Sequence, residues 1–271
     1  MWKKYRINEL DPKDIDITEK RFNGQKTLLP ELLDTEKFIV KEFFKPCLSP
    51  VAVINKVIAK IKYPLTSSGQ PTDLHYFQAF RKWGWSCHKT FKNDYDFWQF
   101  ASETIWLNMG DCEDSSILTG AGLELKQTSY FVVLGRVFKL EEGFYRLLGY
   151  HAWVICYIAN AWRLVETTLD TPYSSPYEMT PVNIRDNEWR VGDILYEAMV
   201  MFNKQELWEW VNTLLENNLE EYYTGKILKE YMKKSKKEKE SKKKYEELHK
   251  SYMKHLNKGS KVITWKKKKV M

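Results

Sequence analysis

The apolar pattern changes from helical to strand-like within one stretch, residues 112–168. After Gly110 and Asp111, apolar residues recur on one face of a helix at Ile117, Leu118, Ala121 and Leu125. Three runs of strand-like composition follow, at 130–137, 150–158 and 162–168, and the pair Ala159-Asn160 separates the last two. A two-residue connection is typical of a β-hairpin, so the stretch predicts a helix followed by paired antiparallel strands.

The predicted hairpin fixes which side chains share a face. If Ala159 and Asn160 form the turn, residue 158 pairs with 161, 153 with 166 and 151 with 168. His151 and Glu166 then lie on one face as diagonal neighbours, and Asp170 lies on the same face. A slip of one residue at each end places Asp170 or Glu166 directly opposite His151, so both carboxylates are candidates. Cys156 falls on the opposite face and is predicted to be core.

Cys112 lies where a helix is expected to begin. Gly110 allows a tight turn and Asp111 is a favourable N-cap residue, which places Cys112 in the first helical turn. Unpaired backbone N–H groups and the helix dipole favour a thiolate there. The neighbouring carboxylates, Asp111, Glu113 and Asp114, are expected to repel that thiolate. A cationic histidine is needed to outweigh them, and His151 is the candidate.

Cys112, His151 and a following carboxylate occur in that order, 39 and 15 residues apart for the pairs Cys112–His151 and His151–Glu166. A nucleophile at a helix start, a strand histidine and an acid on the next strand form the arrangement used by acyl-transfer enzymes. Taken singly, each residue has a structural reading: a buried free cysteine, a hydrogen-bonded strand histidine and a surface carboxylate. The combination favours catalysis.

Three sequence blocks resemble a known superfamily. Gly-Asp-Cys-Glu-Asp at 110–114, His-Ala-Trp-Val at 151–154 and Trp-Arg-Leu-Val-Glu-Thr-Thr at 162–168 resemble the core blocks of the transglutaminase-like superfamily. The segment 96–104 is similar to the lead-in of its bacterial and archaeal cysteine-proteinase branch, and the resemblance covers roughly residues 75–170.

The resemblance implies an α+β fold with a papain-like core, in which the nucleophile-bearing helix packs on an antiparallel sheet. It implies Cys112 as nucleophile, His151 as base and Glu166 as the third member. The chain departs from the superfamily at Glu166-Thr167-Thr168, where Asp-Pro-Thr is usual, and this keeps Asp170 as an alternative acid. Ser115 and Ser116 stand where an aromatic residue and an alanine are frequent.

The implied chemistry is attack of the Cys112 thiolate on an amide or ester carbonyl. The oxyanion would be met by the backbone N–H of Cys112 and one further donor, for which Gln99 and the indole of Trp98 are candidates, although both also suit structural roles. A cysteine peptidase or amidase acting on a protein or peptide is the leading function. The alternatives are a protein-glutamine transamidase or deamidase, and an inactive module with a binding or structural role.

The chain is predicted to contain four segments. They are an N-terminal extension (1–50), a catalytic core (51–202), a helical segment packed on the core (203–232) and a lysine-rich tail (233–271). A helix is expected at 51–63, because apolar residues recur there at helical spacing.

Charge is divided unevenly along the chain. Of the net charge of +7, residues 226–271 carry +13 (18 Lys against 5 Glu), and residues 1–225 carry −6 (25 basic against 31 acidic residues). The tail predicts a solvated arm or a tether to a polyanion. Because its basic residues are all lysine and aromatic residues are sparse, no specific nucleic-acid reader is predicted.

The four cysteines, Cys47, Cys87, Cys112 and Cys156, include no C-x-x-C pair, so neither a zinc site nor a disulfide framework is predicted. No cofactor is predicted. The basic start is not followed by an apolar h-region, and no run approaches the roughly 18 apolar residues of a membrane span. A cytoplasmic protein is expected, and a phage or viral protein released by lysis would have the same features.

Overall fold

A computed structural model describes residues 1–6, 18–20, 26–65 and 98–210, all within one compact unit, Met1–Val211. The helices are α1 (Phe38–Phe44), α2 (Pro50–Lys60), α4 (Ala101–Leu107) and α5 (Cys112–Leu125), with 3₁₀ turns at Leu29–Leu33 and Pro176–Glu178. The strands are β1 (Trp2–Arg6), β2 (Thr18–Lys20), β3 (Lys26–Leu28), β4 (Tyr130–Glu141), β5 (Phe144–Ile158), β6 (Ala161–Val165), β7 (Thr180–Pro181), β8 (Glu188–Val191), β9 (Ile194–Phe202) and β10 (Glu206–Trp210). The predicted α+β class is confirmed.

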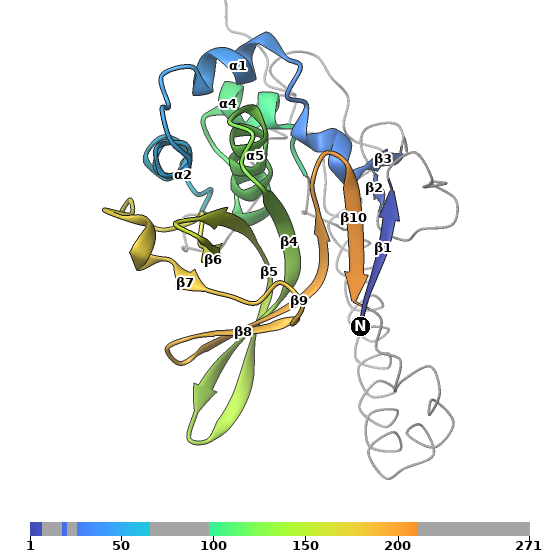
Figure 1. Ribbon diagram of the computed structural model, residues 1–271, viewed down its shortest axis with the longest axis vertical. Coiled ribbons are helices and arrows are strands. Elements are labelled where there is room, and N and C mark those ends of the chain that lie inside the picture. The colour runs from blue at the N-terminus through green and yellow to red at the C-terminus, as the bar shows by residue number, and fades with distance from the viewer. Residues whose placement is uncertain (7–17, 21–25, 66–97, 211–271) are drawn as a thin grey trace, which may run out of the picture. The chain divides into compact units, whose positions relative to one another are not determined.

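One antiparallel sheet organises these elements. Its strand order is β1-β10-β9-β4-β5-β6-β7, β8 pairs with β9, and β2 and β3 form a separate pair. Helix α5 packs against β4 and β5, and α1, α2 and α4 gather around α5 on the same side of the sheet (Figure 1). The β4–β5 hairpin extends away from this helical layer (Figure 1). Residues 1–50 contribute β1 and α1 to the same unit as the predicted core.

Local sequence accounts for where the helices begin. Pro50 occupies the first turn of α2, where no N–H is required, and the Ser49 hydroxyl accepts a hydrogen bond from the backbone N–H of Ala52. In α4, Glu103 accepts a hydrogen bond from the N–H of Phe100 at 2.8 Å, which satisfies one of the unpaired donors at the helix start. The predicted helix at 51–63 is therefore present, shifted toward its N-terminus.

The two faces of the sheet bury different clusters. Val132, Val154 and Cys156 face the helices, whereas Val133, Trp153 and Ile155 belong to an aromatic-rich cluster with Trp189 and Tyr196. Because side chains alternate along β5, His151 lies on the face of Trp153 and Ile155. Cys156 is fully buried under the helices, as predicted.

The predicted hairpin register is confirmed. Ile158 pairs with Ala161 and Val154 pairs with Val165, so Ala159 and Asn160 form the turn. Their φ angles of 50° and 59° are those of a type I′ turn, whose twist matches that of the strands. The second strand is shorter than predicted, because β6 ends at Val165 and Glu166 is the first residue beyond it.

The prediction of a helix from residue 203 is wrong for residues 206–210, which form β10. Leu207 and Trp208 fit a helical repeat, but a short apolar run fits a strand equally well. Pairing with β9 on one side and β1 on the other supplies ladder hydrogen bonds and buries Leu207. The remainder of the predicted helical segment (211–232), the lysine-rich tail and most of the lead-in block (66–97) lie outside the described residues.

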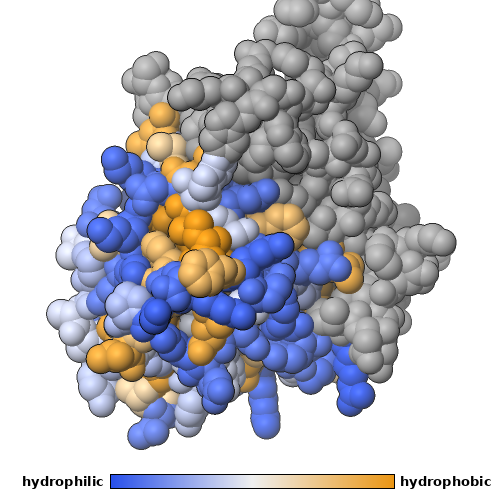
Figure 2. Space-filling view, turned by 90° about the horizontal axis from the view of Figure 1, so that it is seen from above, coloured by the Kyte–Doolittle hydropathy of each residue, from blue (hydrophilic) through white to orange (hydrophobic). Residues whose placement is uncertain are grey.

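The helical layer also exposes apolar side chains on the surface that faces away from the sheet. Seen from above, apolar residues gather in a patch bordered by polar ones (Figure 2). Exposed apolar side chains of the described helical region include Phe38, Ile39, Leu48 and Leu65. None of the helices within the described ranges is long and apolar enough to cross a membrane.

Gly135 of β4 lies opposite His151, at a point where the strands pack closely together. A Cβ at this position would lie 2.0 Å from the backbone oxygen of Glu197 and 2.7 Å from the Trp153 ring. We expect Gly135→Ala to lower the free energy of unfolding in urea by about 1–3 kcal/mol, as an overpacked core does. Ser129→Ala, at an exposed position just before β4, should change it by less than about 0.5 kcal/mol; equal effects would contradict the packing argument.

Candidate active site

Backbone contacts fix the chain as it enters α5. The N–H of Lys62 donates to the carbonyl of Asn108 at 3.3 Å, and the N–H of Gly110 donates to the carbonyl of Lys62 at 3.1 Å. A Cβ on Gly110 would lie 2.6 Å from Cβ of Asp114, so the close approach requires glycine. Cys112 is the first residue of α5, as predicted.

Asp111 occupies the N-cap position, but the predicted capping hydrogen bond from its side chain is absent. The Asp111 carboxyl instead lies beside the Glu113 carboxyl, with oxygens of the two groups within 4.8 Å of each other. The α5 N-terminus is therefore not capped in the expected way, and its first turn is surrounded by side-chain oxygens.

His151 links the helix to the hairpin. Its Nε2 lies 2.7 Å from Oε2 of Glu166, and its ring also interacts with Cys112, which helps to raise the pKa of His151. β6 pairs with β5 only from Val154 to Ile158, so the edge of β5 beside His151 is left open by β6.

The surroundings of His151 favour its charged form. Burial opposes protonation, but hydrogen bonds and charge interactions with Cys112 and Glu166 outweigh it and raise the pKa of His151 to about 10. The ring lies near parallel to Trp153, with centroids 6.2 Å apart, and 6.5 Å from the Tyr196 ring. Aromatic packing and the hydrogen bond with Glu166 therefore orient an imidazolium.

Glu166 is held by both carboxylate oxygens. Oε1 accepts hydrogen bonds from the N–H and hydroxyl of Thr168 at 3.1 and 2.7 Å, and Oε2 accepts from Tyr196 at 3.4 Å besides contacting His151. Burial favours the neutral acid, but the His151 and Thr168 contacts reverse that effect and leave the pKa of Glu166 lowered. Glu166 is therefore an ionised, oriented partner for the imidazolium.

Asp170, the alternative acid, is exposed, and no hydrogen bond or ion pair with His151 appears among the described contacts. The reason is that β6 ends at Val165, so residues beyond it leave the ladder on which the alternation depends. Thr168 follows the same departure and turns back to bind Glu166. Glu166 is the carboxylate that the fold brings to His151.

Gln99 lies beside the first turn of α5. Its backbone N–H donates to Oδ1 of Asp114 at 2.8 Å, and its side-chain Nε2 donates to Oδ2 at 2.6 Å. The residue is fully buried, so one amide hydrogen is committed to positioning α5. Trp98 is partly buried and packs against the helical core cluster. The role of either residue as an oxyanion donor stays a prediction.

Two further links hold the site together, and the sequence did not indicate them. The Ser116 and Thr167 hydroxyls lie 3.0 Å apart, which ties α5 to the segment after β6. The Glu166 N–H donates to the Tyr173 hydroxyl at 2.9 Å, and the backbone of Tyr173 is held by Asn55 of α2 through contacts of 2.7 and 2.9 Å. Isolated polar residues without a repeating pattern carry no sequence signal for such contacts.

Tyr63 is another site residue that sequence reasoning missed. It follows Lys62, which pairs with Met109 in a parallel bridge, and it is half-buried. Burial, followed by the charges of Cys112, Asp111, Glu113 and Glu166, raises its pKa above the usual value. Its hydroxyl therefore keeps its proton and can donate a hydrogen bond near Cys112.

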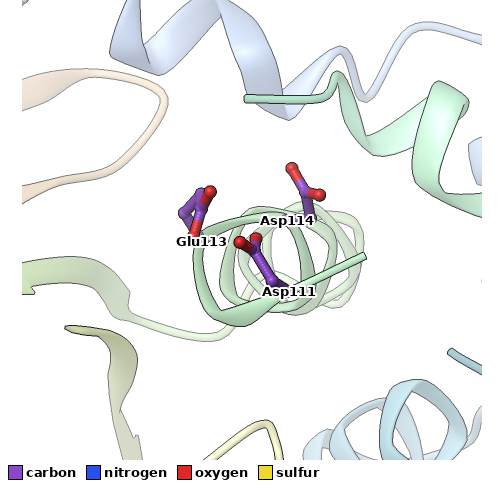
Figure 3. Close-up of side chains that lie close together, drawn as sticks. All are labelled: Asp111, Glu113 and Asp114. Atoms are coloured by element: carbon purple, nitrogen blue, oxygen red, sulfur yellow. The ribbon is translucent and has the colours of Figure 1, made fainter. Parts of the chain in front are cut away.

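Three carboxyl groups gather at the start of α5 (Figure 3). Oxygens of Asp111, Glu113 and Asp114 lie within 4.8 Å of one another, a grouping that could hold a cation. The prediction of no metal did not anticipate it. However, Asp114 uses both oxygens to bind Gln99. Burial and the charges of Asp111, Cys112 and Asp114 raise the pKa of Glu113 well above the usual value, and a protonated carboxyl is a poor ligand.

A cavity of about 430 Å³ lies at the other end of α5. It is lined by Glu124, Tyr130, Trp162 and Gln205 among others. At 1.5 Å per residue, the length of α5 separates Glu124 from Cys112 by roughly 18 Å. This cavity is therefore distinct from the Cys112–His151–Glu166 group.

Comparisons with known proteins give little. No family model and no curated protein matches the chain. Among solved structures, the chain is similar to one from Cytophaga hutchinsonii described as a "putative cysteine protease", at 13% identity and a TM-score of 0.30, with 78% of this chain and 70% of that chain covered.

The origin of the raised pKa of His151 can be tested by titration. We expect Glu166→Gln to move it from about 10 toward 6.5, because the facing negative charge is removed. Asp170→Asn should leave it unchanged, since Asp170 is exposed and has no described contact with the ring. Imidazole signals followed by NMR against pH, assigned with His151→Gln, measure both; a shift in Asp170→Asn instead would identify Asp170 as the partner.

The same pair predicts how stability depends on pH. The raised pKa of His151 contributes stability that is complete below 6.5 and is lost as pH rises through about 10. The lowered pKa of Glu166 contributes stability above 4.5 that is lost at lower pH. Urea unfolding should therefore show the largest deficit of Glu166→Gln, relative to wild type, between about pH 4.5 and 6.5. A deficit independent of pH would indicate lost packing instead.

Proposed function

We propose that the chain is a thiol acyl-transfer enzyme with a papain-like, transglutaminase-like core, acting as a cysteine peptidase or amidase. The observation that carries the proposal is the position of His151, which lies 2.7 Å from Glu166 and whose pKa is raised by both Glu166 and Cys112. Cys112 is half-buried, so its sulfur is not sealed in the core as those of Cys47 and Cys156 are. Nucleophile, base and orienting acid are the parts that acyl transfer through a thioester requires.

Before acylation, the thiol proton of Cys112 has moved to His151, which leaves Cys112 as a thiolate. The Cys112 sulfur attacks the carbonyl carbon of an amide, a C–S bond forms and the carbonyl oxygen becomes an oxyanion. His151 then gives its proton to the amide nitrogen, the C–N bond breaks and the amine leaves. Glu166 stays ionised and holds the ring in place, with its second oxygen fixed by Thr168.

Deacylation repeats these steps with a new nucleophile. His151 takes a proton from water as the water oxygen attacks the thioester carbon, and the C–S bond breaks to release an acid and restore the thiolate. An amine in place of water gives transamidation, and a glutamine side chain as the acyl donor gives deamidation. The same three residues serve each outcome, so the acyl donor and the acceptor together decide between them.

The oxyanion needs donors at the start of α5. The backbone N–H of Cys112 belongs to the first turn, whose N–H groups have no partner within the helix. Gln99 and Trp98 are the proposed side-chain donors. Tyr63 joins them, because its hydroxyl remains protonated beside Cys112. We propose a protein or peptide as the substrate, and the lysine-rich tail as a solvated or polyanion-binding arm.

Selective alkylation tests the activated thiol. Near neutral pH, iodoacetamide should modify Cys112 at least about tenfold faster than Cys47 or Cys156, because burial raises the pKa of both of those thiols, that of Cys156 to about 12. His151→Ala should remove most of this preference. Peptide mass spectrometry measures each rate, and equal rates at all three cysteines would exclude an activated Cys112.

Product analysis then identifies the reaction. Wild type and Cys112→Ala are incubated with a peptide library, with and without a primary amine, and Asp170→Asn serves as the active control. Cleaved peptides indicate hydrolysis, an incorporated amine indicates transamidation, and glutamine converted to glutamate indicates deamidation. No Cys112-dependent product of any kind would leave the inactive module as the better description.

A further inference from the structure

A carboxyl group touches the candidate nucleophile. Oε2 of Glu113 lies 3.2 Å from Sγ of Cys112, and the Glu113 side chain is only 5% exposed. No lysine or arginine of the described residues forms an ion pair with Glu113. A thiolate and a buried carboxylate at that distance would repel each other strongly, so the contact needs a proton between them.

The rest of the cluster shows which carboxyl keeps a proton. Oxygens of Asp111, Glu113 and Asp114 lie within 4.8 Å of one another, and three buried negative charges that close are mutually unfavourable. Asp114 accepts two hydrogen bonds from Gln99, which stabilise its ionised form. Glu113 has no such amide donor, and its Oε1 is buried without a hydrogen-bond partner, so the negative charge of the neighbouring Asp111 favours a proton on Glu113.

We propose that Glu113 is a positioning residue that remains protonated at neutral pH and donates its carboxyl proton to the Cys112 sulfur when that sulfur is a thiolate. The inference rests on the proposed function and concerns how its nucleophile is stabilised. While Cys112 is a thiol, its S–H donates to Oε2 and the Glu113 proton faces Asp111. When the thiol proton moves to His151, the Glu113 proton turns to the sulfur, so one proton serves both states.

This hydrogen bond acts twice in the cycle. When the C–S bond forms, the sulfur loses its negative charge and the contact weakens. When the C–S bond breaks in deacylation, the departing thiolate regains a donor at 3.2 Å. The acidic residues around the nucleophile then no longer oppose thiolate formation as a group, because the one that touches the sulfur is neutral.

The titratable groups that face Glu113 come from α5 and from the segment after α2. Asp111, Cys112 and Asp114 belong to the start of α5, and Tyr63, from the segment after α2, has a neutral hydroxyl. As pH rises, Glu113 will ionise against these charges and the sulfur will lose its donor, so the reactivity of the thiol should reach a maximum and then fall.

Two substitutions of similar size separate the effects. Glu113→Gln keeps a neutral hydrogen-bond donor, whereas Glu113→Met fills the same space without one. Alkylation of Cys112 by iodoacetamide is measured between pH 5 and 10 by peptide mass spectrometry, with melting curves to verify folding. At pH 7 we expect Glu113→Gln within about threefold of wild type and Glu113→Met about tenfold slower, as loss of a hydrogen bond to a charged group predicts.

The ratio of the Glu113→Gln rate to the wild-type rate provides a second measurement that does not need the Met variant. It should stay near one at low pH and rise at alkaline pH, where only the wild-type residue can ionise. A ratio constant with pH, a Glu113→Gln protein that reacts more than about threefold faster than wild type at pH 7, or a folded Glu113→Met protein as reactive as wild type would each overturn the proposal.

His151→Ala keeps this test separate from the proposed function. If His151→Ala reacts as fast as wild type, the Cys112–His151 pair fails, whatever Glu113 does. If His151→Ala is slow but the Glu113 variants show no effect of pH, only the role of Glu113 fails. Asp170→Asn provides a control that also removes one carboxylate, because Asp170 is exposed and has no described contact with Cys112 or Glu113; its reactivity at pH 7 should equal that of wild type.

Discussion

The hydrogen bond between His151 and Glu166 is the interaction on which the site depends, and the β5–β6 turn makes it possible. A two-residue turn at Ala159 and Asn160 sets the pairing of the two strands, and any other loop length would move Glu166 to another position along β5 or to the other face. Glu166 then meets His151 diagonally at 2.7 Å, and the imidazolium this produces is what can stabilise a thiolate. A backbone turn that contributes no side chain to the site thus decides the electrostatics of the nucleophile.

The nucleophile lies among more negative groups than positive ones, and hydrogen bonds as well as one ion pair offset the negative charges. Two donors of Gln99 stabilise the Asp114 carboxylate, and His151, Thr168 and Tyr196 stabilise that of Glu166. These contacts also fix positions, because each joins segments from different elements. The polar groups that tune charge are therefore the same groups that hold α5, β5 and the segment after β6 together.

The sequence predicts the parts of the site that depend on local rules. Helix onset at Cys112, the turn at Ala159-Asn160 and the burial of Cys156 all follow from spacing and alternation. It fails where tertiary contacts decide. Leu207 and Trp208 form a strand because β1 and β9 flank them, and Ser116 meets Thr167 because two distant segments are packed together. From the sequence alone, Glu113 is expected only to repel a Cys112 thiolate, because its position next to Cys112 does not reveal that its side chain is buried or that its carboxyl keeps a proton.

The end of β6 explains why a glutamate suits this position. Glu166 lies one residue past the last ladder pair, and its partner is a diagonal neighbour, a separation of about 7–8 Å between backbones rather than the shorter distance of a direct pair. Glutamate is one methylene longer than aspartate, and the extra length lets Oε2 reach the ring while Oε1 remains bound to Thr168. An aspartate in this backbone would have to give up one of the two contacts, because a single short side chain cannot span both. The length of the glutamate side chain thus suits the early end of β6. That early end also leaves the edge of β5 beside His151 open, on the side where Cys112 approaches it.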